Sequence, residues 1–77
     1  MKLVLHTIDC SHCRALEFKL NKENMEFERE TNMDRVIKAG FRSAPVLEVI
    51  DEEGHSEFYE YLDAMKWINK NKGTKEN

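Results

Sequence analysis

Residues 2–13 read KLVLHTIDCSHC, a short apolar run that leads directly into two cysteines separated by two residues. The nearly continuous run of apolar side chains over residues 2–7 predicts a strand that is covered on both faces. Asp9 and Ser11 are residue types that commonly start helices, so the chain is expected to enter a helix here. Cys10 is therefore predicted at the start of a helix, and Cys13 one turn into it.

The rest of the chain continues this alternation of strands and helices. The first helix is expected from Ser11 to about Asn24, with Cys13, Leu16 and Leu20 on its buried stripe. A half-buried strand is predicted over 25–30, followed by a short helix that is capped by Thr31 or Asn32 and closed by Gly40. A strand over 45–50, a turn at 51–54 and a strand over about 56–61 then form a hairpin. The last element is predicted to be a helix over about 62–71. The expected order is β-α-β-α-β-β-α.

This order predicts a single α/β domain. A β-α-β start requires a parallel strand pair with a right-handed crossover, and the closing hairpin adds antiparallel pairing. The expected architecture is the minimal thioredoxin fold, a single four-stranded mixed sheet flanked by helices. Because 77 residues have room for one core, residues 1–77 are expected to form one domain, with a frayed tail at 72–77.

The distribution of charge argues against two classes of partner. The formal net charge is −3, and the 12 lysines and arginines are scattered along the chain. Nucleic acids and anionic membranes both need a concentrated basic face, so neither is expected as a partner. No apolar run approaches membrane-spanning length, and the first residues lack the pattern of a signal peptide. We therefore expect a cytoplasmic protein that acts as a monomer.

Cys10 and Cys13 form a Cys-x-x-Cys motif with Ser11 and His12 between them. Free main-chain N–H groups and the positive end of the helix dipole stabilise a thiolate at a helix N-terminus. The two intervening residues let the second sulfur reach the first, and disulfide exchange needs such a pair of nucleophile and resolving thiol. The motif after a buried strand therefore favours a redox-active disulfide.

A metal site is the main alternative for these cysteines. A structural zinc ion takes four ligands, usually with a second pair of Cys or His at short spacing. His6, His12 and His55 form no such pair, so no zinc ion or other resident cofactor is expected. An iron–sulfur cluster bridged between two copies of the chain, or a binding module without turnover, stays open as an alternative.

Residues 40–45, Gly-Phe-Arg-Ser-Ala-Pro, precede the strongest predicted strand. Pro45 restricts Ala44 to an extended conformation. If the Ala44–Pro45 peptide bond is cis, the Ala44 main chain turns outward and can pair with an extended peptide. Arg42, Ser43, Ala44 and Pro45 are therefore the candidate substrate-binding residues.

A strand, a Cys-x-x-Cys motif, a helix and a proline-led strand together resemble the glutaredoxin-like branch of the thioredoxin superfamily, over nearly the whole chain. Residues 40–46, and Asp9 directly before Cys10, are similar to the small redoxins that donate electrons to ribonucleotide reductase. Those redoxins are recharged by thioredoxin reductase. The resemblance implies that Cys10 attacks protein disulfides, that Cys13 resolves the mixed disulfide, and that a cis Pro45 faces the two sulfurs.

Glutathione-dependent glutaredoxins are the alternative within this branch. They usually carry a cation two residues before the first cysteine, where this chain has Ile8, and paired glycines ahead of the last helix, where it has Glu60 to Asp63. Glu60 adds a negative charge that would repel the carboxylates of glutathione. The Gly-Phe-Arg-Pro sequence frequent in the reductase-donor group is also missing, so neither group is fully matched. Thioredoxin reductase is favoured over glutathione as the electron source.

His12 stands directly before the second cysteine, as in strongly oxidising members of the superfamily. One interpretation is that His12 raises the reduction potential of the pair by stabilising the Cys10 thiolate, an effect that Asp9 opposes. The other is that His12 is an exposed residue with little effect on the cysteines. Asp9, Ser11 and His12 are thus the residues expected to tune the motif.

Overall fold

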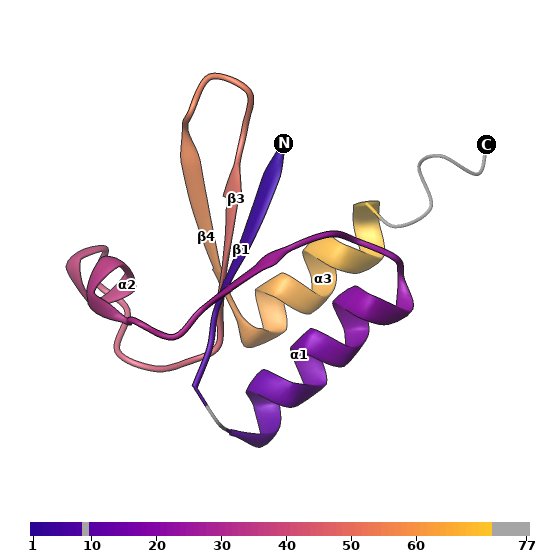
Figure 1. Cartoon of the computed structure of the whole chain (residues 1–77), viewed down its shortest axis with the longest axis horizontal. Coiled ribbons are helices and arrows are strands. Elements are labelled where there is room, and N and C mark those ends of the chain that lie inside the picture. Colours follow the sequence, from indigo (N-terminus) through magenta and orange to yellow (C-terminus); the bar gives the residue numbers. More distant parts are fainter. Residues whose placement is uncertain (9, 72–77) are drawn as a thin grey trace.

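Strands and helices follow one another in the predicted order in the computed structural model, which describes residues 1–8 and 10–71 (Figure 1). They are β1 (Lys2–His6), α1 (Ser11–Lys22), β2 (Glu28–Glu30), α2 (Asp34–Lys38), β3 (Val46–Ile50), β4 (Ser56–Glu60) and α3 (Tyr61–Asn71). The expected tail at 72–77 and Asp9 lie outside the described residues. None of the helices in the described part of the chain is long and apolar enough to cross a membrane.

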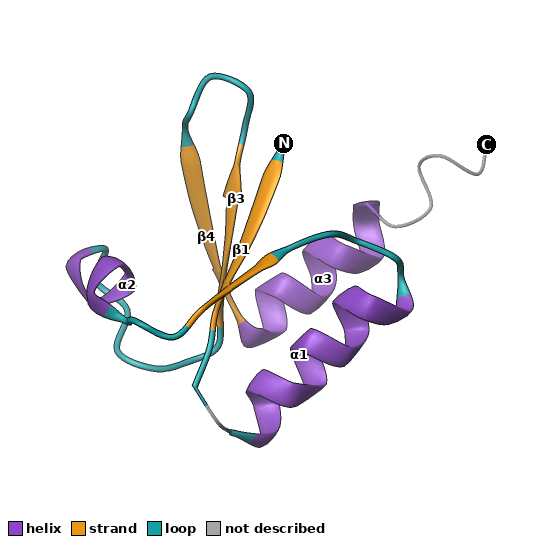
Figure 2. Ribbon diagram, in the orientation of Figure 1, coloured by secondary structure: helices purple, strands orange, loops and turns teal. Residues whose placement is uncertain are grey.

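The four strands form one mixed sheet in the order β2-β1-β3-β4. β1 pairs with β2 in parallel and with β3 antiparallel, and β4 pairs antiparallel with β3. Helices α1 and α3 lie side by side on one face of this sheet, and α2 lies on the other side (Figure 2). The fold is the minimal thioredoxin fold predicted from the sequence.

The core lies between the sheet and the pair α1 and α3. Successive side chains of a strand point to opposite faces, so Leu3 and Leu5 face the helices while Val4 and His6 face the side of α2. The predicted stripe of α1 is confirmed, since Cys13, Leu16 and Leu20 are its buried residues. The buried core cluster consists of Leu3, Leu5, Leu16, Leu20, Leu47, Ala64 and Ile68.

The strand predicted over 25–30 is shorter than expected, because pairing begins only at Glu28. The chain leaves α1 through Asn24, whose φ is 59°, and the Met25 N–H donates to the Leu20 carbonyl at 3.0 Å. Met25 and Phe27 still pack against the core. The apolar side chains of this segment therefore alternate because they pack on the core, not because the segment pairs as a strand. This is why the sequence pattern predicted too long a strand.

The short helix α2 has Met33 as its N-cap residue, without a side-chain cap hydrogen bond, rather than the expected Thr31 or Asn32, because the Asn32 side chain forms its hydrogen bond just before the helix. It begins at Asp34, whose N–H donates to Asn32 Oδ1 at 2.9 Å. Gly40 follows the helix with a φ of 100°, a left-handed conformation that glycine adopts without the steric penalty of a side chain. The remaining element boundaries differ from the predicted ones by one or two residues.

Candidate active site

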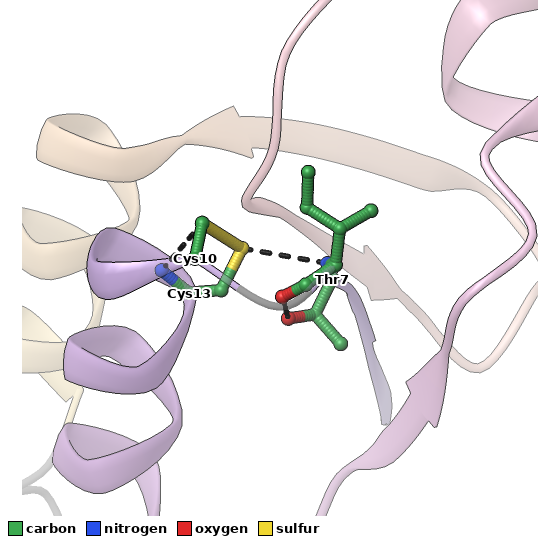
Figure 3. Close-up of a disulfide and its surroundings, with 4 residues drawn as sticks. Thr7, Cys10 and Cys13 are labelled. Atoms are coloured by element: carbon green, nitrogen blue, oxygen red, sulfur yellow. Dashed lines mark hydrogen bonds between the residues drawn. A yellow bond between two sulfur atoms is a disulfide. The ribbon is translucent and has the colours of Figure 1, made fainter.

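The segment after β1 is fixed by hydrogen bonds and carries the chain to the cysteines (Figure 3). The Thr7 N–H donates to the Glu30 carbonyl at 2.9 Å, and the Thr7 hydroxyl donates to the Ile8 carbonyl at 3.0 Å. The Ile8 N–H then donates to Cys13 Sγ at 3.4 Å. The main chain just after β1 thus holds Cys13 Sγ in place.

Cys10 and Cys13 form a disulfide at the N-terminus of α1. Cys10 is the N-cap residue, with an extended main chain at φ −144° and ψ 162°, and its Sγ accepts the Cys13 N–H at 3.1 Å. Its carbonyl accepts the Arg14 N–H at 3.0 Å, which closes the first helical turn. The sequence prediction of a redox pair at a helix start is in agreement with this geometry.

The two sulfurs differ in accessibility. Cys13 is 1% exposed, whereas Cys10 is only half-buried. Cys10 Sγ accepts the Cys13 N–H, and Cys13 Sγ accepts the Ile8 N–H. Main-chain donors of this kind and the positive end of the helix dipole stabilise a thiolate at a helix N-terminus. This arrangement suits an accessible attacking sulfur and a shielded resolving one.

A surface groove of about 510 Å³ joins the motif to the start of β3. The Ala44–Pro45 bond is cis, as expected, and both residues line the groove with Ser43 and His12. Arg42 is exposed and is not among the lining residues, and Ser11 is exposed at the first position of α1. The groove is lined by His12, Ser43, Ala44, Pro45, Glu60, Tyr61, Leu62 and Asp63.

Tyr61 also lines the groove, although it is not among the site residues predicted from the sequence. Its ring lies 4.5 Å from the His12 ring, measured between centroids, at an angle of 31°. The β3–β4 register pairs Val46 with Glu60, so the residues next in line are Pro45 and Tyr61. This register was the signal available in the sequence, because the turn at 51–54 determines which residues of the hairpin face one another.

A second polar cluster lies on the opposite face of the sheet, in a hollow of about 450 Å³. Glu48 is buried there against His6, Arg35 and Ser56. Burial would raise the pKa of Glu48, but hydrogen bonds from Arg35, Ser56 and His6 outweigh it and lower the pKa to about 2. Among residues 1–8 and 10–71, no three His, Cys, Asp or Glu side chains come together as metal ligands.

No family model and no curated protein matches the sequence. Among solved structures, the chain is similar to the glutaredoxin-like protein NrdH-redoxin from Escherichia coli, with a TM-score of 0.64 and 25% identity. The match covers 92% of this chain and 95% of that chain, whose structure was described as the basis of a thioredoxin-like activity profile. The chain therefore resembles this glutaredoxin-like redoxin over nearly its whole length. With its Cys-x-x-Cys disulfide at the N-terminus of α1, the redoxin is a thiol–disulfide oxidoreductase.

Proposed function

We propose that the redoxin reduces disulfides of other proteins in the cytoplasm, with ribonucleotide reductase as the target and thioredoxin reductase as the source of electrons. The observation that carries the proposal is the pairing of a half-buried Cys10 at a helix N-terminus with a buried Cys13 behind it. An oxidoreductase acting on protein disulfides needs this asymmetry, because only one of its sulfurs should meet the target.

The proposed reaction has two exchange steps. The Cys10 thiolate attacks one sulfur of the target disulfide, which forms a Cys10–target mixed disulfide and releases the other target sulfur as a thiolate. The Cys13 thiolate then attacks Cys10 Sγ, which releases the second target sulfur. Two electrons have then passed to the target, and the redoxin holds the Cys10–Cys13 disulfide until a reductase returns two electrons.

Two observations support a reductase rather than glutathione as the electron source. The groove beside the motif has no Lys or Arg among its lining residues and includes the carboxylates of Glu60 and Asp63. Each hydrogen bond to a charged group contributes about 1.5–3 kcal/mol, so lacking two of them weakens glutathione binding by about a hundredfold or more. The similarity to NrdH-redoxin, with its thioredoxin-like activity profile, points the same way.

A coupled assay with two reductants tests the proposal. Oxidised redoxin is offered thioredoxin reductase, or glutathione with glutathione reductase, at matched concentrations while NADPH consumption is followed. We expect turnover with thioredoxin reductase and little with glutathione, and none with Cys10→Ser. Adding ribonucleotide reductase and its substrate should give NADPH-dependent reduction of the ribonucleotide. Efficient turnover with glutathione alone would place the protein with the glutathione-dependent glutaredoxins, and a coloured protein after purification would indicate the bridged cluster.

A further inference from the structure

The groove beside the active-site disulfide has walls of three chemical kinds. Pro45 and Leu62 provide apolar surface, and the Leu62 side chain is 70% exposed. His12 and Tyr61 provide the aromatic surface, with their two rings in tilted contact. The carboxylates of Glu60 and Asp63 complete the lining, so one groove combines apolar, aromatic and acidic groups.

The two carboxylates have no cationic partner in the part of the chain that the structure describes. Glu60 and Asp63 are both exposed, and no ion pair or side-chain hydrogen bond found among residues 1–8 and 10–71 engages either of them. They lie at adjacent elements, Glu60 at the end of β4 and Asp63 in the first turn of α3. Two uncompensated negative charges therefore face whatever enters the groove.

We infer that the redoxin selects protein disulfides in which an arginine or lysine lies next to the reactive cysteine. The inference rests on the proposed function, since it concerns the substrate of the same site. The aliphatic stem of such a side chain packs on apolar surface such as Leu62 and Pro45. Its cationic head reaches the face of Tyr61 and the carboxylates, where cation–π contact and charge-assisted hydrogen bonds hold it. A guanidinium, being planar, suits both contacts better than an ammonium.

The expected size of this preference follows from the exposure of the carboxylates. An exposed ion pair typically changes an equilibrium by about threefold, so two carboxylates together should separate a basic from an acidic substrate by about tenfold. Salt screens exposed charges within about 10 Å at 0.1 M, so the preference should shrink as ionic strength rises. A preference that came from apolar contact alone would not respond to salt in this direction.

Two series of three short peptide disulfides, which differ in one residue within each series, provide the test. Each is a homodimer joined through a single cysteine, with Arg, Gln or Glu as its neighbour, placed before the cysteine in one series and after it in another. Reduced redoxin is mixed with each peptide, and the appearance of peptide thiol is followed in a single turnover. We expect the rate order Arg, Gln, Glu in at least one series, with about a tenfold span at low salt.

Variants that remove a carboxylate charge but keep the size of the side chain show which residues cause the preference for the Arg peptide. Glu60→Gln and Asp63→Asn should each narrow the ratio of Arg-peptide to Glu-peptide rates, and the double variant should bring it close to one. Asn also retains the capacity to accept a hydrogen bond in the first turn of α3. Glu52→Gln is the matched control, because it removes the same charge from the exposed turn at the other end of the β3–β4 hairpin (Figure 1).

The outcomes separate this inference from the proposed function. If the wild-type redoxin reduces all three peptides equally, or if Glu52→Gln narrows the ratio as much as Glu60→Gln does, the inference is wrong while the proposed function stands. If it reduces none of them, including the Gln peptide, the proposed function fails and the inference falls with it.

Discussion

His6 Nε2 and Glu48 Oε1 lie 2.8 Å apart, and both side chains are 1% exposed. Arg35 closes the network from α2, because its Nε donates to Glu48 Oε1 at 2.9 Å and its Nη2 donates to Glu48 Oε2 at 2.7 Å. The Ser56 hydroxyl donates to the same carboxylate from β4. One buried carboxylate thus links β1, β4 and α2 to β3, on the face of the sheet away from α1 and α3.

Replacing Glu48 by glutamine should destabilise the fold. The amide keeps the shape of the side chain but loses the charge that Arg35 and His6 hold, and it turns an N–H₂ group toward donors. A buried group left without a proper partner costs about 1–3 kcal/mol, so we expect Glu48→Gln to lower the free energy of unfolding by about 2 kcal/mol. Urea denaturation followed by circular dichroism measures this change.

The control for this prediction is Glu52→Gln, which changes the same residue type at an exposed turn position. Exposed substitutions usually alter stability by no more than about 0.5 kcal/mol. Equal unfolding free energies for the two variants would show that the Glu48 network contributes nothing to stability.

The stability of the fold should also depend on pH through Glu48. Its folded pKa is about 2, below the ordinary value of 4.5, because the hydrogen bonds from Arg35, Ser56 and His6 outweigh the effect of burial. A lowered folded pKa means that the stabilisation is fully present above the unfolded pKa and is lost as the pH falls toward the folded one. The unfolding free energy should therefore fall between about pH 5 and pH 2, and fall less steeply in Glu48→Gln. Parallel pH profiles for the two proteins would assign the acid sensitivity to other carboxylates.

Strong local signals allowed much of the fold and the disulfide to be predicted from the sequence. The apolar run before Cys10, the stripe of α1 and the glycine after α2 each specify a local structure with few alternatives. Pro45 could be placed at the groove because its position before a strand, combined with the Cys-x-x-Cys motif, indicates a known arrangement of elements.

The missed features depend on contacts between elements distant in sequence. Glu48 lies within the apolar strand β3, and nothing local shows that a histidine 42 residues earlier will face it. The register of β1 and β3, which pairs Val4 with Glu48 and His6 with Val46, brings these side chains to one face. Met25 and Phe27 show the converse, since a strand-like pattern also arises from an unpaired segment packed on the core.

A Cys13→Ser variant should accumulate the mixed disulfide between Cys10 and a protein target. Serine cannot resolve the intermediate, and Cys10 remains accessible at the helix start.

Iodoacetamide added to the reduced wild-type protein at neutral pH should correspondingly label Cys10 before Cys13, because Cys13 is 1% exposed. Mass spectrometry of the trapped and alkylated peptides measures both. Preferential labelling of Cys13 would reverse the two roles.

Replacing His12 by tyrosine should lower the reduction potential of the Cys10–Cys13 pair. An imidazole within the motif can stabilise the Cys10 thiolate of the reduced form, and losing that stabilisation makes the disulfide harder to reduce. One charge-assisted interaction of about 1.5 kcal/mol corresponds to about 30 mV for this two-electron couple, so a shift of that order is expected. Equilibration with glutathione redox buffers, followed by acid quenching and counting of free thiols, gives the potential. Tyr61→Phe is the matched control, since it retains an aromatic ring against His12, whose centroid lies 4.5 Å from that of Tyr61. An unchanged or higher reduction potential in His12→Tyr would show that His12 lines the groove but does not raise the potential of the pair.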